Sequence, residues 1–321
     1  MGQIIFIGVV AGAAVTVMLF AALASGSLIP VILFYLAPLP IMIAVLGWHH
    51  IAGMIAAVMA AAGLSVLVDF WLAVTFLLAV GLPAWWLGYL AQLARATNSA
   101  GQDGLEWYPV GRLVVWSALM GTVAVAVAVP HFGFDADAFR EGLRHTFDTL
   151  IRVQREGQEA VAPEITPPTD IGRLLDVLVV VIPPASAALS TVTNVFNLWL
   201  AGRIVRFSGQ LKRPWPVLSD MALPPFLPAV LALAIGGAFM TNLLGILCGV
   251  LAASLFMAYA LLGFAVLHTL TRGHNARSFL LAGTYGAVFM FGWPLIVIAA
   301  VGLADATLGI RARLTRVRRP P

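Results

Sequence analysis

Charge is the property that this sequence has least of. Asp, Glu, Lys and Arg make up 10% of its 321 residues, whereas hydrophobic residues make up 61%. Soluble globular domains carry about 25% charged residues, so this composition excludes an ordinary water-soluble protein. The apolar runs are long, continuous and rich in Leu, Ala and Val, without the period-two alternation of membrane strands. The sequence therefore predicts an all-α fold, a polytopic transmembrane helical bundle surrounded by lipid.

Cysteine and lysine are almost absent. Cys248 is the only cysteine and lies inside an apolar run, which excludes an intramolecular disulfide and a cysteine metal cluster. Lys212 is the only lysine beside 17 arginines. The isoelectric point of about 9.7 would suit a nucleic-acid binder, but most of these cations fall between or after apolar runs, where they set orientation in a membrane. We expect the lipid bilayer as a partner and no nucleic acid.

The common catalytic and nucleotide-binding motifs are absent as well. The sequence contains no P-loop, HExxH, GxSxG or GxGxxG pattern. His49 and His50 are adjacent, but without a third ligand nearby they favour a solvated turn over a metal site. We therefore expect that the protein is not an enzyme and that it holds no cofactor and no metal.

What the sequence does contain is a succession of apolar segments. At roughly 20 residues per span they leave room for about ten spans, with about eight as the lower bound. The expected spans are 2–24, 28–47, 51–68, 70–93, 113–130, a long helix from about 171, 225–240, 243–270, and 278–310 divided in two at Gly292-Trp293-Pro294. We treat 1–321 as a single integral membrane domain.

Prolines predict irregular helices in this bundle. The second span carries Pro30, Pro38 and Pro40, which should bend it and free backbone carbonyls that need partners elsewhere in the bundle. Further prolines should kink the fourth span at Pro83, break the long helix at Pro183-Pro184 and end it at Pro214 and Pro216.

One long segment should leave the membrane. Residues 131–170 hold eight of the 14 acidic residues. Within this segment, 136–153 has apolar residues at helical spacing, which predicts an amphipathic helix that lies on the bilayer or caps the bundle. In contrast to this acidic segment, residues 311–321 form a basic tail.

The distribution of basic residues predicts the orientation. An even number of spans places both termini on one side, and that side then holds 13 of the 18 basic residues. Cytoplasmic loops carry an excess of Lys and Arg, so both termini and the basic tail should be cytoplasmic and the acidic excursion external. No glycosylation sequon or sorting motif indicates an organelle, which favours a bacterial inner membrane.

A polar stripe marks the long helix. Its members recur at steps of three and four residues, so they share one helix face: Ser186, Ser190, Thr193, Asn194 and Asn197. Hydrocarbon does not solvate amides, so this face should point toward protein. The stripe either hydrogen-bonds neighbouring helices or lines a cavity for a polar solute, and the sequence leaves both alternatives open.

Charged residues within or beside the spans are few. Asp305 lies inside the last span, where a carboxylate is a functional hypothesis by default; pairing with Arg311 or a basic loop residue is favoured over a proton or cation role. Arg173 and Asp176 are three residues apart and could pair with each other. The exit of the long helix carries a candidate face for protein partners in the membrane or cytoplasm, formed by Arg203, Arg206, Lys212 and Arg213.

Short motifs in the middle of the chain resemble a known family. They are the Trp107-Tyr108-Pro109 turn, the helix 194–209 with its exit Leu200-Ala201-Gly202-Arg203, and the Leu223-Pro224 entry to the next span. This pattern resembles the YybS-like family of multi-pass bacterial membrane proteins of unknown function, which is grouped with the substrate-binding subunits of energy-coupling-factor transporters. The resemblance implies a small-molecule binder that needs separate ATPase and coupling subunits.

In those transporter subunits, small residues spaced AxxxA in the first helix meet a partner membrane subunit. Gly8 and Gly12 offer a looser version of that pattern here, and packing against another helix of the same chain is the favoured alternative.

Two functional hypotheses follow. The first is a transporter-like protein whose cavity, lined by the polar stripe and the bent second and fourth spans, binds a small solute. The second is a non-transporting membrane scaffold that recruits partners through its basic cytoplasmic face.

Overall fold

The computed structural model describes residues 1–24, 28–96, 105–158, 168–217, 220–311 and 313. The N-terminal part, residues 2–91, contains α1 (Gly2–Ala24), α2 (Leu28–Tyr35), α3 (Pro38–Gly47), α4 (His50–Leu67), α5 (Phe70–Phe76), the π-helical turn η1 (Leu77–Gly81) and α6 (Leu82–Ala91). After a short hairpin follow α7 (Val110–Phe132), α8 (Ala136–Gln158), α9 (Pro168–Phe207), α10 (Leu227–Gly237), α11 (Leu243–Leu270), α12 (Arg277–Phe291) and α13 (Pro294–Leu308). Most of the basic tail 311–321 lies outside the described residues.

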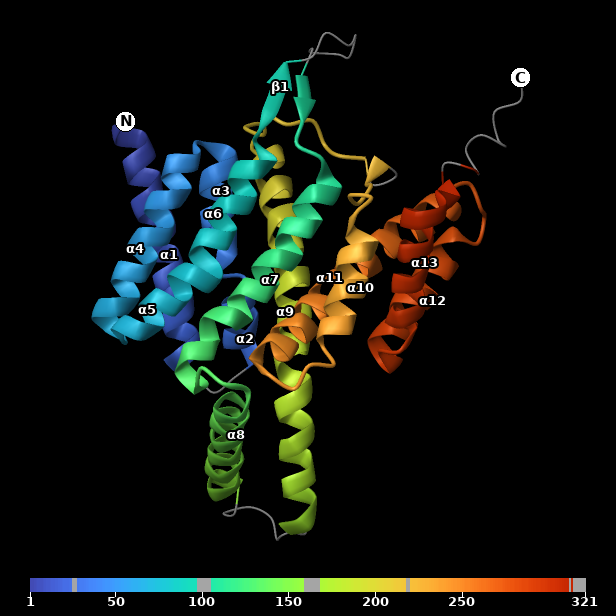
Figure 1. The fold of residues 1–321 in the computed structure, drawn as a ribbon. Coiled ribbons are helices and arrows are strands. Elements are labelled where there is room, and N and C mark those ends of the chain that lie inside the picture. Colours follow the sequence, from blue (N-terminus) through green and yellow to red (C-terminus); the bar gives the residue numbers. More distant parts are fainter. Residues whose placement is uncertain (25–27, 97–104, 159–167, 218–219, 312, 314–321) are drawn as a thin grey trace.

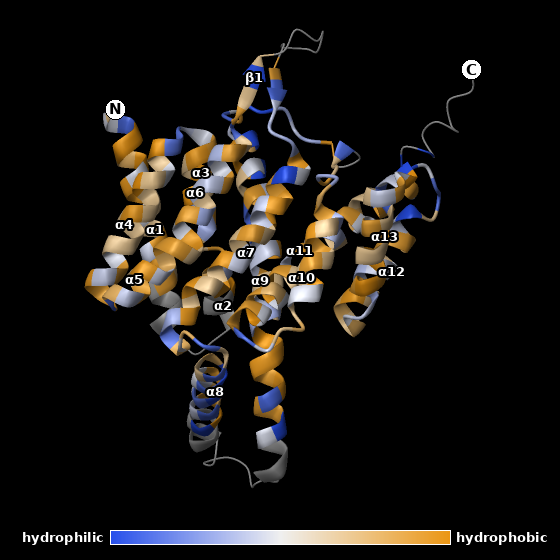
Figure 2. Ribbon diagram, in the orientation of Figure 1, coloured by the Kyte–Doolittle hydropathy of each residue, from blue (hydrophilic) through white to orange (hydrophobic). Residues whose placement is uncertain are grey.

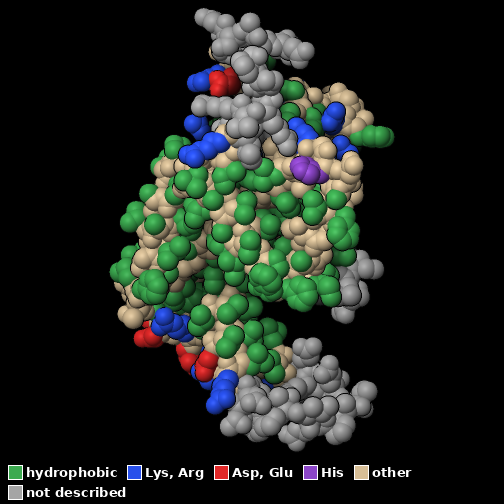
Figure 3. Space-filling model, turned by 90° about the vertical axis from the view of Figure 1, so that its right-hand side faces the viewer, with side chains coloured by type: hydrophobic (Ala, Val, Ile, Leu, Met, Phe, Trp, Pro, Cys, Tyr) green, Lys and Arg blue, Asp and Glu red, His purple; other side chains and the backbone are tan. Residues whose placement is uncertain are grey.

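The architecture is a helical bundle of the membrane type, as predicted. Within the described residues, six helical segments are long and apolar enough to cross a membrane: 2–19, 50–67, 70–91, 110–132, 172–207 and 243–270. Shorter apolar helices cover 32–47, 227–237 and 294–308, so the expected count of about ten spans stays approximate. Apolar residues cover the helices of the bundle along most of their length (Figure 2), and on one face charged side chains gather only at the two ends of a wide apolar belt (Figure 3).

α11 is the central helix. In the apolar stretch of α11, 56% of the residues are buried inside the protein, against 22–33% in those of the other five candidate spans. It packs against α7, α9, α10 and α13. The outer helices bury little of their surface within the protein, as expected where lipid covers the rest.

The small residues of α1 pack against α4. A Cβ atom added at Gly8 would lie 2.7 Å from Ile55 Cβ, and one added at Gly12 would lie 2.7 Å from Met59 Cβ. The groove is therefore filled by a helix of the same chain, and it does not offer the exposed contact that the looser AxxxA pattern would require for a partner subunit.

Two of the expected irregularities are present. The second span is divided into α2 and α3 at Leu36 and Ala37, next to Pro38. The fourth span passes through the π-helical turn η1 directly before Pro83, which lies in the first turn of α6. A proline has no N–H to give to the preceding turn, so the local backbone rearranges at both places.

The prediction for the long helix was wrong in two respects. α9 is continuous over 40 residues and contains Pro183 and Pro184 in its interior. Proline fixes φ near the helical value, and an apolar span has no better alternative than to stay helical. α9 also ends at Phe207, before Pro214, because Gly209 has a φ of +73° and Gln210 N–H donates to the Val205 carbonyl oxygen, as in a Schellman cap.

The expected polar loop after α6 contains a small hairpin. β1 (Ala94–Ala96) pairs in antiparallel register with β2 (Leu105–Trp107), and Arg95 faces Glu106 with a 2.6 Å ion pair. Strands of three residues are too short to show an alternating pattern, so the sequence did not reveal them.

Within the expected acidic excursion 131–170, residues 136–158 form the amphipathic helix α8, which packs against α7 and α9, and residues 159–167 lie outside the described residues. A helix of 40 residues is about 60 Å long and exceeds a hydrocarbon core of about 30 Å, so α9 projects beyond the other helices, and α8 stands beside this projection (Figure 1). Phe139 and Leu143 of α8 are buried. Asp176 of α9 pairs with Arg144 of α8 at 2.6 Å and not with the expected Arg173.

The last apolar stretch forms two helices, as predicted. Gly292, with a φ of +69°, ends α12, and Pro294 begins α13. α1 begins and α13 ends at the same end of the bundle (Figure 1), as an even number of passes requires.

Candidate functional site

Four of the five stripe residues of α9 line a cavity. Ser186, Ser190, Thr193 and Asn194 contribute its polar groups. The remaining wall is apolar and comes from α2, α3, η1, α7, α8 and α9: Phe34, Tyr35, Pro38, Ala79, Val80, Ala124, Val125, Ala128, Phe132, Phe139, Leu143, Ile182, Pro183 and Leu189. The cavity has a volume of about 380 Å³, and among the described residues Tyr35 is the only ionisable side chain in its wall.

The two asparagines of the stripe are buried, as expected of a face that points toward protein. Asn197 is 0% exposed, and its Nδ2 donates hydrogen bonds of 2.8 Å to the carbonyl oxygens of Tyr35 and Thr193. The Tyr35 carbonyl is free because Pro38 lacks an N–H, while Leu39 N–H turns to Leu36. Asn197 therefore joins α9 to the broken second span, which is one of the two roles that the sequence left open.

Asn194 is placed differently. It is 4% exposed and lines the cavity, and its Nδ2 has no hydrogen-bond partner among the described residues. The Oδ1 of Asn197 also lacks a partner, but Asn197 does not line the cavity. Buried amides are almost always hydrogen-bonded, so an unpaired amide N–H at a cavity wall is a position where a ligand or water would bind.

Both interrupted spans border this cavity. Tyr35 and Pro38 flank the junction of α2 and α3, and Ala79 and Val80 belong to η1. Irregular backbone within apolar spans is tolerated where it lies inside protein or lines a cavity, and discontinuous helices commonly form the binding sites of transporters.

The helix α8 contributes two residues to the wall of the cavity. Phe139 packs edge-on against Phe132 with ring centroids 5.8 Å apart, and Leu143 lies in the same wall. The connection to α7 runs through Gly133, with a φ of +138°. Asp135 Oδ1 accepts the N–H groups of Asp137 and Ala138 and so caps the start of α8.

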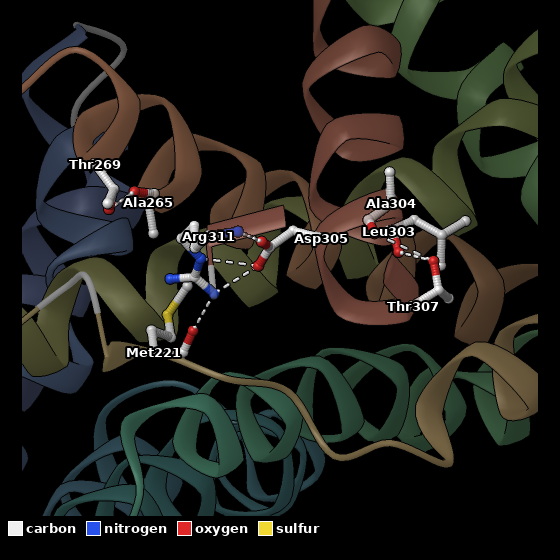
Figure 4. A network of polar contacts seen from close by, with 8 residues as sticks. All are labelled: Met221, Ala265, Thr269, Leu303, Ala304, Asp305, Thr307 and Arg311. Carbon is white, nitrogen blue, oxygen red and sulfur yellow. Dashed lines mark hydrogen bonds and ion pairs between the residues drawn. The ribbon is translucent and has the colours of Figure 1, made fainter. Parts of the chain in front are cut away.

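Asp305 pairs with Arg311, as favoured from the sequence. The carboxylate is 6% exposed; its Oδ2 lies 2.7 Å from Arg311 Nη2, and its Oδ1 accepts the Arg311 backbone N–H at 2.9 Å. Arg311 Nη2 also donates to the Met221 carbonyl oxygen at 2.7 Å (Figure 4). Both carboxylate oxygens are engaged, so the geometry favours a structural link between the end of α13 and the segment before α10.

The four cations at the exit of α9 do not form one exposed surface. Arg203 and Arg206 are exposed, with their guanidinium carbons 5.5 and 5.2 Å from the ring centroid of Trp215, and Lys212 is exposed. Arg213 is half-buried and donates to the Ala91 carbonyl oxygen. Burial lowers the pKa of Arg213.

Several site features were not predicted from the sequence. The π-helical turn has no residue signature of its own, although Pro83 indicated an irregularity nearby. Thr191, which lies on α9 between the stripe residues, is fully buried, but its hydroxyl donates to the Ala187 carbonyl oxygen of its own helix. Among the described residues, no group of three or more His, Cys, Asp or Glu side chains could hold a metal ion, and His49 accepts the Ile51 N–H at the start of α4.

Comparisons with known proteins identify the family. Neither the curated proteins nor the solved structures gave a match to this chain. Residues 14–306 match the family model described as "Predicted membrane protein (DUF2232)". Since the match covers most of the chain, this protein belongs to the DUF2232 family of predicted membrane proteins.

Proposed function

We propose that this protein is a transporter-like membrane protein that binds a small solute in the cavity beside Asn194. The single observation that carries the proposal is Asn194, which lines a cavity of about 380 Å³ and whose buried Nδ2 has no hydrogen-bond partner among the described residues. That volume is within the range of roughly 300–1,000 Å³ that is common for small-molecule sites.

The wall chemistry selects the class of solute. Apolar side chains form most of the wall, and its hydroxyl groups and amide are neutral. A charged solute would lose its hydration without gaining a counter-charge, which is costly. The solute that fits is uncharged, largely apolar, and carries a hydrogen-bond acceptor for Asn194.

The wider setting is part of the same proposal. The protein would reside in a bacterial inner membrane with both termini cytoplasmic and would act without catalysing a reaction. The YybS-like resemblance and its link to energy-coupling-factor transporters support a binder that depends on other subunits for energy. Such a subunit would contact a surface other than the Gly8 and Gly12 face, because α4 covers that face.

A binding screen tests the proposal. Purified protein is heated with a panel of uncharged, sparingly polar solutes, and a stabilising solute is then tested for uptake into proteoliposomes. Asn194→Leu should weaken binding about tenfold, because a hydrogen bond contributes about 1–1.5 kcal/mol. Thr191→Val is the matched control, since Thr191 is buried on the same helix but does not line the cavity.

A solute that binds wild-type protein and Asn194→Leu equally well would place the site elsewhere. A panel in which every stabilising solute is an anion would contradict the neutral wall as the binding surface.

A second function, recruitment of a partner by a membrane scaffold, is favoured by the exposed guanidinium groups of Arg203 and Arg206 beside Trp215. Charge reversal of Arg203, Arg206 and Lys212 should then abolish pull-down of an acidic partner, whereas Asn194→Leu and Asn197→Leu should not affect it. Arg213 is left out of this variant because its side chain is half-buried and so less accessible to a partner.

A further inference from the structure

A second and larger cavity lies at the other edge of α9. Its volume is about 660 Å³, and most of its wall comes from α7, α9, α11, α12 and the segment after α9, with single residues from α3, α6 and α13. α12 forms its outer side and buries none of its own residues in the protein. It stands with α13 at the edge of the bundle (Figure 1). The cavity is therefore an interhelical groove at the lipid-facing side of the molecule.

The polar groups of this groove include a cation and an imidazole. Arg213 follows α9, and His268 lies in the last turn of α11; both line the cavity. His268 Nε2 is 3.0 Å from the hydroxyl oxygen of Tyr285, which connects α11 to α12. Most other lining residues are apolar, among them Val195, Leu261 and Phe289. The groove is therefore lined by a guanidinium, an imidazole and many apolar side chains. This lining suits an amphiphilic ligand, which has a polar head and an apolar chain.

The charge of the groove is positive and only partly compensated. The guanidinium of Arg213 is half-buried and pairs with no carboxylate among the described residues. Arg203 and Arg206 are exposed at the end of α9, beside the lining residue Trp215. Guanidinium groups bind phosphate through strong charge-assisted hydrogen bonds, and basic pockets between membrane helices bind lipid headgroups.

We propose that this groove is a binding site for one anionic phospholipid, with its phosphate at Arg213 and His268 and an acyl chain along Leu261 and Phe289. The site shares no lining residue with the solute cavity beside Asn194. The lipid site can therefore be tested independently of the proposed solute binding.

Native mass spectrometry tests the proposal. Detergent-purified protein is incubated with phosphatidylglycerol or with phosphatidylcholine of the same acyl chains. Wild-type protein should retain one phosphatidylglycerol and prefer it to phosphatidylcholine. Arg213→Gln should lower phosphatidylglycerol binding about tenfold or more, because a hydrogen bond to a charged group is the stronger kind. Arg272→Gln, which removes an exposed cation outside the groove, should bind as wild type does.

Leu261→Trp is a second, independent variant. It fills the apolar part of the groove and should abolish retention of both lipids while leaving Arg213 in place. Equal retention of the two lipids by wild-type protein, or equal binding by Arg213→Gln and Arg272→Gln, would overturn the proposal. So would a dimer without bound lipid that Leu261→Trp dissociates, because a second copy would then occupy the groove.

Discussion

Asn194 and Asn197 are both asparagines and lie about one turn apart on α9, but their surroundings give them different roles. Asn197 donates to a carbonyl that the proline-broken second span leaves free, whereas Asn194 lines a cavity and its buried Nδ2 has no partner among the described residues. The amide group can serve either role, and the neighbouring helix decides between them.

This difference predicts opposite effects on stability. Asn197→Leu should lower the free energy of unfolding by about 1–3 kcal/mol, because it leaves the Tyr35 carbonyl oxygen buried and unpaired. Asn194→Leu should be neutral or slightly stabilising, because it removes an unpaired polar group. Thermal unfolding in detergent checks both variants. A larger loss for Asn194→Leu than for Asn197→Leu would contradict the assignment of roles.

Asp305 and Arg311 form the buried ion pair of the described residues, with side chains 5% and 12% exposed. Asp305→Asn should destabilise the protein by about 3–5 kcal/mol, since Arg311 then keeps a buried charge without its carboxylate. The double variant Asp305→Asn with Arg311→Gln should recover part of this loss. The measurement is a double-mutant cycle on unfolding free energies, and additive single losses would show that the pair contributes nothing specific.

At the scale of elements, the junction between α7 and α8 depends on one residue. Gly133 has a φ of +138° and a ψ of 156°, a region that only glycine adopts readily, and an added Cβ would lie 2.5 Å from Ala138 Cβ. Gly133→Ala should therefore lower the unfolding free energy by at least about 1–3 kcal/mol and loosen α8 over the cavity.

Gly286 provides the matched control for this prediction. It lies inside α12, and an added Cβ would meet nothing within 4 Å. Gly286→Ala should stabilise its helix by about 0.5–1 kcal/mol. Limited proteolysis near α8 should increase for Gly133→Ala and stay unchanged for Gly286→Ala. Equal cleavage of the two variants would show that the junction does not control α8.

Prolines acted differently in the second span and in α9. At Pro38 the second span breaks, and Asn197 of α9 donates a hydrogen bond to the freed carbonyl oxygen of Tyr35. At Pro183 and Pro184 α9 continues. The residue type indicates only that a hydrogen bond is lost; whether the helix breaks depends on what the neighbouring helices offer to the freed carbonyl.

For the whole molecule, the arrangement predicts which parts share a side of the membrane. Cys248 is the only cysteine, so Cys248→Ser gives a background for single-cysteine labelling. In intact cells a membrane-impermeant maleimide should label Thr149→Cys in α8. It should label Ser208→Cys, after α9, only once the membrane is permeabilised, because the basic end should be cytoplasmic. Labelling of both positions under the same condition would contradict this orientation.

The sequence by itself determined the class of this protein and most of its helices. Hydrocarbon cannot hydrogen-bond a peptide group, so long apolar runs with little charge must form helices. The division of the last stretch at Gly292 and Pro294 followed from its length and from these two helix-breaking residues. The sequence also predicted that the stripe of α9 faces protein. Asn194 and Asn197 are buried, whereas Ser190 and Thr193 are half-buried and Ser186 is exposed.

Only the tertiary structure decided which polar side chains have partners and which residues these partners are. The hairpin partner of Arg95, the pairing of Asp176 with Arg144, the filling of the Gly8 and Gly12 groove by α4 and the unpaired amide of Asn194 all depend on residues distant in the chain. Solvation by lipid acts on each segment separately and can be derived from its composition. Hydrogen bonds and close packing between helices depend on which surfaces meet, and no single segment contains that information.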